Sequence, residues 1–211
     1  MSNIEVHGAT KTFGSKTLFQ NLTFSVPAGQ MMAVMGTSGS GKSTLLNCIG
    51  LLEKLDAGSL TVGGQQISAF SDKQQRYFRR DSLGYMFQNY ALIENSTIRD
   101  NLEVALAASG KSKIRGADFD GALQRVGLAG RGKELVYSLS GGEQQRVALA
   151  RLLVKLPAVV LADEPTGALD STNESMVMNE LRNIANAGAT VLVATHSNVV
   201  MSHCDTVLDL S

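Results

Sequence analysis

The stretch MMAVMGTSGSGKSTLLNCIGLL, residues 31–52, decides the fold of this 211-residue chain. A compact apolar run is followed by GTSGSGKS at 36–43, which matches the pattern G-x-x-x-x-G-K-[ST], and then by a segment of helical character. Strand, glycine-rich loop and helix in this order open a nucleotide-binding βαβ unit. The glycines let backbone N–H groups turn inward around phosphates, and the helix directs its positive N-terminal end at them. We therefore expect Lys42 to reach the β- and γ-phosphates and Ser43 to bind Mg²⁺.

Composition and charge point to no partner. Lys and Arg together number 19, as do Asp and Glu, so no overall basic charge draws the chain to nucleic acid or anionic lipid. The first residues lack the pattern of a signal peptide, and no run of about 18 apolar residues occurs. Cys48 and Cys204 lack metal-ligand spacing and are expected to be buried, inert thiols. These observations predict a cytoplasmic globular protein of one domain, with no membrane span of its own.

The apolar pattern along the chain predicts an α/β fold. Alternating apolar and polar residues in the first thirty positions indicate short antiparallel strands. AVVLAD at 158–163 and TVLVAT at 190–195 are near-continuous apolar runs, typical of parallel strands buried on both faces. Between about 96 and 156 the spacing of apolar residues is helical. We expect one domain over 1–211, with a core at 1–88 and 157–211 and a helical subdomain at 89–156.

Four polar side chains follow apolar strands and are expected at one sheet edge. Asp163 and Glu164 end one buried strand, where Asp163 would hold Mg²⁺ and Glu164 would polarise the attacking water. The alternative is a pair of solvated acids in a turn. His196 follows the next strand and would bind the γ-phosphate or orient the water, although a lone histidine is more often structural. Gln88 follows a third, short strand; it is either a γ-phosphate sensor that contacts the metal's water or an ordinary polar loop residue.

A second segment, YSLSGGEQQRVALARLL at 137–153, has features of a phosphate-binding element. Ser140, Gly141 and Gly142 open a long helix, yet the segment contains no lysine and no obvious metal ligand. The phosphate-binding loop lies about a hundred residues earlier in the same chain. The segment therefore raises the question of which nucleotide it would contact.

Taken together, the motifs resemble those of the nucleotide-binding subunits of ABC transporters over essentially the whole chain. In chain order they are GTSGSGKS, the glutamine of MFQN, LSGGEQQRVALAR, VVLADEP, GALD and the histidine of VATHS. The resemblance implies a RecA-like P-loop NTPase core with an antiparallel β subdomain and an inserted helical subdomain that carries the LSGGEQQR signature. It also implies an ATPase that uses ATP and Mg²⁺.

Carried over to this sequence, the resemblance assigns Lys42, Gln88, Glu164 and His196 to catalysis. Ser43, Gln88 and Asp163 would be the metal ligands. The nucleotide contacts would come from the phosphate loop, from an aromatic ring on adenine, from the signature and from the loop that links the two ATP sites: Phe13, Gly36, Thr37, Ser38, Gly39, Ser40, Gly41, Lys42, Ser43, Thr44, Ser140, Gly141, Gly142 and Asp170. Phe13 stands where the family usually has tyrosine; it keeps the stacking surface and loses the hydroxyl.

The resemblance also suggests which partners the chain has. In the family two subunits pack head to tail, and each ATP lies between the phosphate loop of one and the signature helix of the other. Ser140 and Gly142 would then complete the second subunit's site, which explains the missing lysine and metal ligand. A homodimer attached at the inner face of the membrane would drive separate permease subunits. The apolar segment 90–93 would receive the permease, or would merely pack beneath the helical subdomain.

The finer resemblance is to the short exporter-type group of lipoprotein-release, macrolide-efflux and bacteriocin-export ATPases. It is carried by LLNCIGLL, QNYALI, GEQQR and DEPTG. An exporter of peptide, lipid-linked or antimicrobial substrate is expected. The same engine regulating a membrane partner that transports nothing, such as a cell-wall hydrolase activator, fits the motifs equally. A nucleic-acid function is not expected, because the one basic cluster, KQQRYFRR at 73–80, is typical of a solvated helix face.

Overall fold

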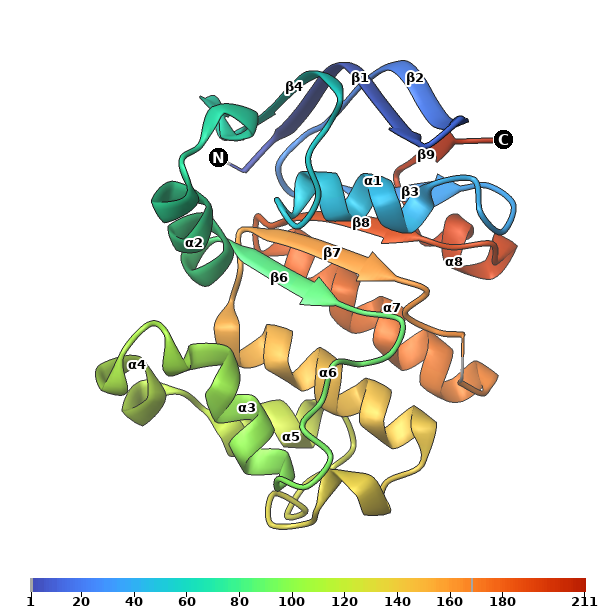
Figure 1. Cartoon of the computed structure of the whole chain (residues 1–211). Helices are drawn as coiled ribbons and strands as arrows, with labels where there is room; N and C mark the ends of the chain where they lie inside the picture. Colours follow the sequence, from blue (N-terminus) through green and yellow to red (C-terminus); the bar gives the residue numbers. More distant parts are fainter. Residues whose placement is uncertain (1, 168) are drawn as a thin grey trace.

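A five-stranded parallel sheet forms the centre of the computed structural model, which describes residues 2–167 and 169–211 (Figure 1). Its strand order is β6-β7-β8-β3-β9, so strands distant in sequence are neighbours in space. The strands are β3 (Met31–Met35), β6 (Leu83–Met86), β7 (Val159–Asp163), β8 (Thr190–Ala194) and β9 (Thr206–Asp209). Both apolar runs that the sequence marks as buried parallel strands, β7 and β8, are confirmed.

Alternate residues of these strands face two separate hydrophobic layers. Val160 and Ala162 belong to the layer that contains α3 (Ile98–Ala107), α5 (Phe119–Arg125), α6 (Gly141–Lys155) and α7 (Ser171–Asn186). Val159 and Leu161 belong to the layer around α1 (Lys42–Ile49). Each of these side chains is fully buried. Burial on both faces explains why the run contains no polar residue before Asp163.

A four-stranded antiparallel sheet of order β2-β1-β4-β5 covers α1 on the side away from the parallel sheet (Figure 1). Its strands are β1 (Ile4–Phe13), β2 (Lys16–Val26), β4 (Ala57–Val62) and β5 (Gln65–Gln66). Ile4 and Val6 point inward from β1 and are fully buried with Leu45 and Leu46 of α1. The antiparallel strands expected in the first thirty residues are confirmed.

The region with helical periodicity folds as four α-helices, α3 to α6, on the opposite face of the parallel sheet (Figure 1). A fifth helix, α7, packs on the same face. They are α3 (Ile98–Ala107), α4 (Lys111–Gly116), α5 (Phe119–Arg125), α6 (Gly141–Lys155) and α7 (Ser171–Asn186). The expected apolar stripe Ile98, Leu102 and Leu106 is buried along α3. The helical pattern is interrupted where Gly110, Gly127 and Gly130 adopt positive φ, because these angles end a right-handed helix.

The remaining elements are short. They are α2 (Asp72–Asp81), α8 (Asn198–Ser202) and the 3₁₀ turns η1 (Ile67–Ala69) and η2 (Val136–Ser138). The basic cluster 73–80 lies on α2, of which only Phe78 is buried, as expected for a solvated helix face. Within the part of the chain that the structure describes, each helix is too short or too polar to cross a membrane.

Both cysteines are free. Burial raises the pKa of the Cys48 thiol to about 11, and burial likewise raises the pKa of Cys204 to about 11. Because the thiolate is the reactive form, a raised pKa lowers the reactivity of both thiols at neutral pH; Cys48 is buried as expected, whereas Cys204 is only partly buried.

Gly84 on β6 provides a test of how tightly α6 packs on the sheet. A Cβ atom at this position would lie 2.6 Å from Leu152 Cδ2 and 2.6 Å from Pro157 Cγ. Gly84→Ala is therefore expected to lower the free energy of unfolding by about 1–3 kcal/mol, measured by urea titration. Gly116→Ala is the matched control, because a Cβ there meets nothing within 4 Å. Equal midpoints for the two variants would contradict close packing at β6.

Candidate nucleotide site

The carboxyl ends of four parallel strands meet at one edge of the sheet. Asp163 is paired with Ala194 of β8, and Ala194 is paired with Val34 of β3, so the three strands end at the same level. The loops that leave these ends surround a cleft of about 890 Å³. It is lined by Phe13, Leu18, Thr37, Ser38, Gly39, Gly41, Lys42, Ser43, Thr44, Gln88, Tyr90, Gln145, Asp163, Glu164, Gly167 and His196. The four polar side chains expected at this edge are all in the lining.

The loop after β3 has a backbone that only glycine adopts easily. Gly36, Gly39 and Gly41 have φ values of 148°, 77° and 102°. A Cβ on Gly36 would lie 2.4 Å from Ser40 Oγ. Lys42 is 8% exposed, and its Nζ donates to the carbonyl oxygens of Gly36 (2.7 Å) and Thr37 (3.1 Å). The ammonium group is thus held over the loop, at the N-terminus of α1, where an anion is favoured.

Asp163 has the properties of a metal ligand. Its side chain is 7% exposed, and its Oδ1 is buried without a hydrogen-bond partner among the described residues. Burial raises the pKa of Asp163, and hydrogen bonding from the Ser43 hydroxyl and the charge of Lys42 oppose that rise. An unpaired buried carboxylate is costly and calls for a cation.

The other donors fit Mg²⁺ better than a protein-caged metal. The described residues contain no group of three or more His, Cys, Asp or Glu side chains suited to a metal. Mg²⁺ is usually bound by one or two protein oxygens, with waters and substrate phosphates completing the octahedron. The Asp163 carboxylate and the Ser43 hydroxyl supply such oxygens beside the phosphate loop.

Glu164 is held from three directions. Its backbone lies in the left-handed region, with φ of 47°, where a residue with a Cβ is strained. Its N–H donates to Ala194 O (2.9 Å), and its carbonyl accepts from Gln145 Nε2 on α6 (3.3 Å). Its Oε1 lies 2.9 Å from His196 Nδ1. The strained backbone is therefore maintained by β8 and by α6, the histidine holds Oε1, and the residue lines the cleft.

Two other expected residues lie at the mouth of the cleft. Phe13 is 50% exposed, and Lys11 Nζ lies 4.9 Å from the centroid of its ring. Gln88 is exposed on the loop after β6 and shares the lining with Phe13. Four lining residues were not expected as site residues from the sequence: Leu18, Tyr90, Gln145 and Gly167. Gln145 and Gly167 had signals, because they lie within LSGGEQQR and GALD.

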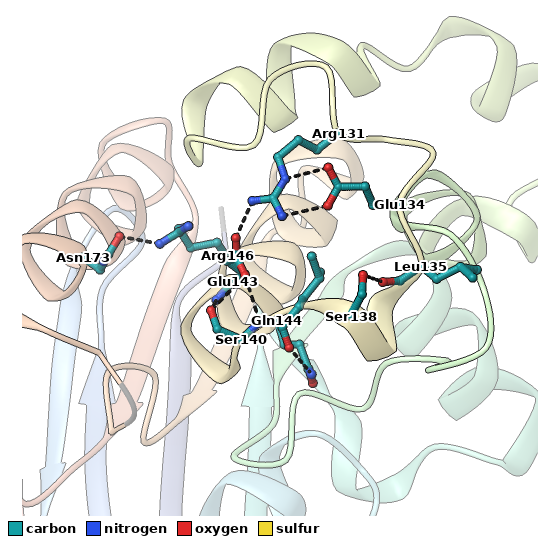
Figure 2. Close-up of polar contacts among 10 residues, drawn as sticks. Arg131, Glu134, Leu135, Ser138, Ser140, Glu143, Gln144, Arg146 and Asn173 are labelled. Atoms are coloured by element: carbon teal, nitrogen blue, oxygen red, sulfur yellow. Dashed lines mark hydrogen bonds and ion pairs between the residues drawn. The ribbon is translucent and has the colours of Figure 1, made fainter.

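The signature residues are not brought to this cleft. Among the described residues that line it, Ser140, Gly141 and Gly142 do not occur. Ser140 is the exposed N-cap of α6, where its hydroxyl accepts from Glu143 N (Figure 2). Asp170 is likewise outside the lining and caps α7 by accepting from Asn173 N (2.9 Å). Ala168, in the same GALD motif, lies outside the described residues.

The segment 90–93 packs partly against the core, as one of the two expectations had it. Tyr90 and Leu92 pack against the core, whereas Ile93 is 46% exposed. Tyr90 and Ala91 both have left-handed φ values, 62° and 49°. Ala91 O accepts from Arg151 Nη1 of α6 (2.7 Å), which holds this unusual backbone in place.

The loop is also joined to α3 by Asn101, which is fully buried. Asn101 Oδ1 accepts from Ile93 N (2.8 Å), and its Nδ2 donates to Ile93 O and Thr97 O (3.0 Å each). Arg151 Nη2 donates to the same Asn101 Oδ1 (2.8 Å). The loop after β6 is therefore fixed to α3 and α6 by several partly buried polar contacts.

A family profile described as ABC transporter matches residues 19–167, from β2 through the phosphate loop and the signature to the loop after β7. The chain belongs to the ABC transporter family. This ABC ATPase domain has the same fold as the bacterial ABC transporter cassette MJ0796 in its dimeric structure, with a TM-score of 0.89. The two sequences are 33% identical, and the match covers 98% of this chain and 94% of that chain. A post-hydrolysis dimer of MJ0796 bound to ADP and Pi matches with a TM-score of 0.88, 30% identity and coverage of 99% and 94%.

Curated relatives of this ABC domain include exporters. It is 37% identical to the macrolide export ATP-binding/permease protein MacB of Pectobacterium atrosepticum over 99% of this chain and 33% of the relative. It is 40% identical to an uncharacterized ABC transporter ATP-binding protein of Mycobacterium tuberculosis over 92% of this chain and 79% of the relative. The ABC domain thus spans about a third of the length of the export ATP-binding/permease relatives.

Asp163 provides a test that separates stability from function in this ABC domain. Because its pKa is raised, the ionised carboxylate destabilises the fold at neutral pH, and Asp163→Asn is expected to raise the Tm by about 2–4 °C. In the parent protein, a raised pKa of Asp163 stabilises the folded state at acid pH, where the carboxyl is protonated. This stabilisation is lost as the pH rises through the pKa of Asp163 in the folded state. The gain of the variant should therefore shrink as the pH falls. Thermal unfolding between acid and neutral pH measures this, and ATP turnover should be lost.

Asp56→Asn is the control for that measurement. Asp56 is exposed, accepts from Thr12 N and Thr12 Oγ1 (2.7 Å each), and has a pKa that these hydrogen bonds lower. Its replacement should lower the Tm slightly or leave it unchanged. A Tm gain of equal size in both variants would contradict the assignment of a costly charge at Asp163.

Proposed function

We propose that the chain is the ATP-hydrolysing subunit of an ABC transporter and acts as a head-to-tail homodimer that encloses two ATP molecules. The observation that carries this proposal is the separation, within one chain, of the cleft from the signature. The exposed N-terminus of α6 at Ser140 has the character of a phosphate site, yet the cleft with the phosphate loop does not include it. A second copy related by two-fold symmetry would supply Ser140, Gly141 and Gly142 to the cleft of the first.

Within the cleft, the chain's own residues bind the nucleotide. Backbone N–H groups of Gly36–Gly41 and the N-terminus of α1 would surround the phosphates, with Thr44 as the third residue of the helix. Lys42 Nζ would exchange its loop carbonyls for β- and γ-phosphate oxygens. Phe13, half exposed at the mouth, would stack on adenine.

The metal position follows from the unpaired oxygen. Asp163 and the Ser43 hydroxyl would hold Mg²⁺, with Gln88 contacting its water shell. When bound, the ion would neutralise charge on the β- and γ-phosphates. The cation would favour the ionised form of Asp163, which is buried at the end of β7, and would add to the effect of the Ser43 hydroxyl and of Lys42.

Glu164 would act as the general base. Its Oε1 faces His196 Nδ1, so Oε2 is the oxygen available to accept the proton of the attacking water. His196, whose side chain is 75% exposed, would hold the carboxylate in place with one ring nitrogen and turn the other toward the γ-phosphate. Asp170, at the N-cap of α7, would link the two sites across the dimer.

Membrane coupling is proposed through the segment 90–93. The fixed loop presents Ile93 outward, where an apolar helix of a permease would dock. Residues 89–156 would then act as a subdomain that transmits the motion. Relatives are named as export ATP-binding/permease proteins, which supports an exporter of peptide, lipid-linked or antimicrobial substrate. The chain would lie in the cytoplasm at the inner face of the membrane and bind no nucleic acid.

Replacing the general base should trap the dimer. Glu164→Gln keeps the size of the side chain and removes its basicity, so ATP would bind and close the two subunits without being hydrolysed. Light scattering after gel filtration in ATP and Mg²⁺ should show a dimer, and ADP should leave a monomer. Adding Ser140→Ala to this variant should weaken dimer formation, because the hydroxyl that reaches the partner's nucleotide is gone. A strictly monomeric Glu164→Gln protein in ATP would refute the homodimer.

The docking surface is tested by Ile93→Asp. A charge at this exposed position opposes burial against an apolar helix, so recovery of the chain with the membrane fraction of cells that express its permease should fall at least about tenfold. Val104→Asp is the matched control, since Val104 is similarly exposed, at 49%, on α3. Equal losses in the two variants would show that segment 90–93 is not the docking site.

A further inference from the structure

Arg131 contacts two carboxylates at once beside the signature (Figure 2). It lies in the loop between α5 and η2. Its Nε and Nη2 donate to the two carboxylate oxygens of Glu134, at 2.9 and 2.7 Å. Its Nη1 donates to Oε1 of Glu143, on the first turn of α6. All three donor nitrogens of the guanidinium group are therefore engaged, two of them with one carboxylate and one with the other.

The second oxygen of Glu143 binds Ser140. Glu143 Oε2 accepts from Ser140 N (2.8 Å) and from Ser140 Oγ (2.9 Å), which forms a capping box at the start of α6. A continuous path of hydrogen bonds thus runs from Arg131 through Glu143 to the Ser140 hydroxyl. Hydrogen bonds from Arg131 and Ser140 lower the pKa of Glu143 to about 2, so this carboxylate is charged at neutral pH.

A charged carboxylate here conflicts with phosphate binding. The N-terminus of α6 attracts anions, and Glu143 already occupies part of that positive field. A triphosphate that approached Ser140 would meet this negative charge within one helical turn. The Ser140 hydroxyl also has a single proton, now directed at Glu143, which must turn away before it can bind a phosphate oxygen.

We propose that Arg131 is a positioning residue of the signature: it neutralises Glu143 and holds Glu143 Oε1, so that the Ser140 hydroxyl can turn from Glu143 and donate its hydrogen bond to the ATP of the second subunit. The inference rests on the proposed head-to-tail dimer. The cluster of Arg131, Glu134 and Glu143 carries a net charge of −1, and without Arg131 it would carry −2. Arg131 therefore halves the negative charge that the nucleotide meets.

A purely structural role for Arg131 makes a different prediction. Arg131 also anchors the loop through backbone bonds, since its N–H donates to Leu128 O and its carbonyl accepts from Glu134 N. If the side chain served only to fold this loop, the defect of Arg131→Ala would persist whatever residue stands at 143. If it compensates charge, removing the charge of Glu143 should repair the defect.

The experiment measures the ATP concentration that gives half-maximal dimer in the Glu164→Gln background, by light scattering after gel filtration. Arg131→Ala should raise this concentration about tenfold, because an uncompensated carboxylate then faces the nucleotide. Glu143→Gln retains an oxygen acceptor for Ser140 and carries no charge. It should return Arg131→Ala close to the parent value, and by itself it should lower the ATP requirement, because the cluster becomes neutral.

Controls separate this inference from the proposed function. Arg125→Ala removes another ion-paired arginine, that of Arg125 with Glu180, and should leave the ATP requirement unchanged. Circular dichroism verifies folding; if Arg131→Ala does not fold, Arg131→Gln, which keeps polar donors without the charge, replaces it. If the Glu164→Gln protein without further changes stays monomeric in ATP, the proposed dimer is refuted. Two outcomes would overturn the role of Arg131 and leave the proposed dimer intact, provided that the Glu164→Gln protein dimerises in ATP. In the first, Arg131→Ala does not change the ATP requirement; in the second, Glu143→Gln does not repair the defect of Arg131→Ala.

Discussion

The common level at which the parallel strands end is the constraint on which the rest of the structure depends. β3, β7 and β8 are paired residue by residue, so the phosphate loop, Glu164 and His196 leave the sheet side by side. The apolar residues of these strands are buried on both faces of the sheet. A slip of one strand by one residue would move each of its side chains into the other hydrophobic layer and disturb the packing of both layers. The positions of the reactive groups are therefore fixed by hydrophobic packing far from the cleft.

This packing also sustains features that are unfavourable in isolation. Asp163 has a buried oxygen without a partner among the described residues, and Glu164 has a left-handed backbone. Each lies at the last position of β7 or immediately after it, where the ladder to β8 and the contact from Gln145 are strong enough to maintain it. Local strain of this kind is typical of sites that have been shaped for binding rather than for stability.

Much of this arrangement could be predicted from the sequence, because the signals are local. GTSGSGKS and the apolar runs before Asp163 and His196 each encode a strand together with the loop that leaves it. Contacts between distant segments could not be predicted. The bond from Gln145 to the Glu164 carbonyl depends on how α6 packs across the sheet, and the left-handed backbone of Tyr90 and Ala91 occurs in residues with no tendency toward it.

The contact between Arg151 and the loop after β6 gives α6 two ends with different neighbours. Ser140 begins the helix, and Arg151, about three turns later, holds Ala91 and Asn101. A helix of 15 residues is about 22 Å long and resists compression along its axis, because every turn is braced by its own hydrogen bonds. In the proposed dimer, α6 would therefore pass a displacement at Ser140, caused by the second subunit's nucleotide, to the loop after β6 of its own subunit.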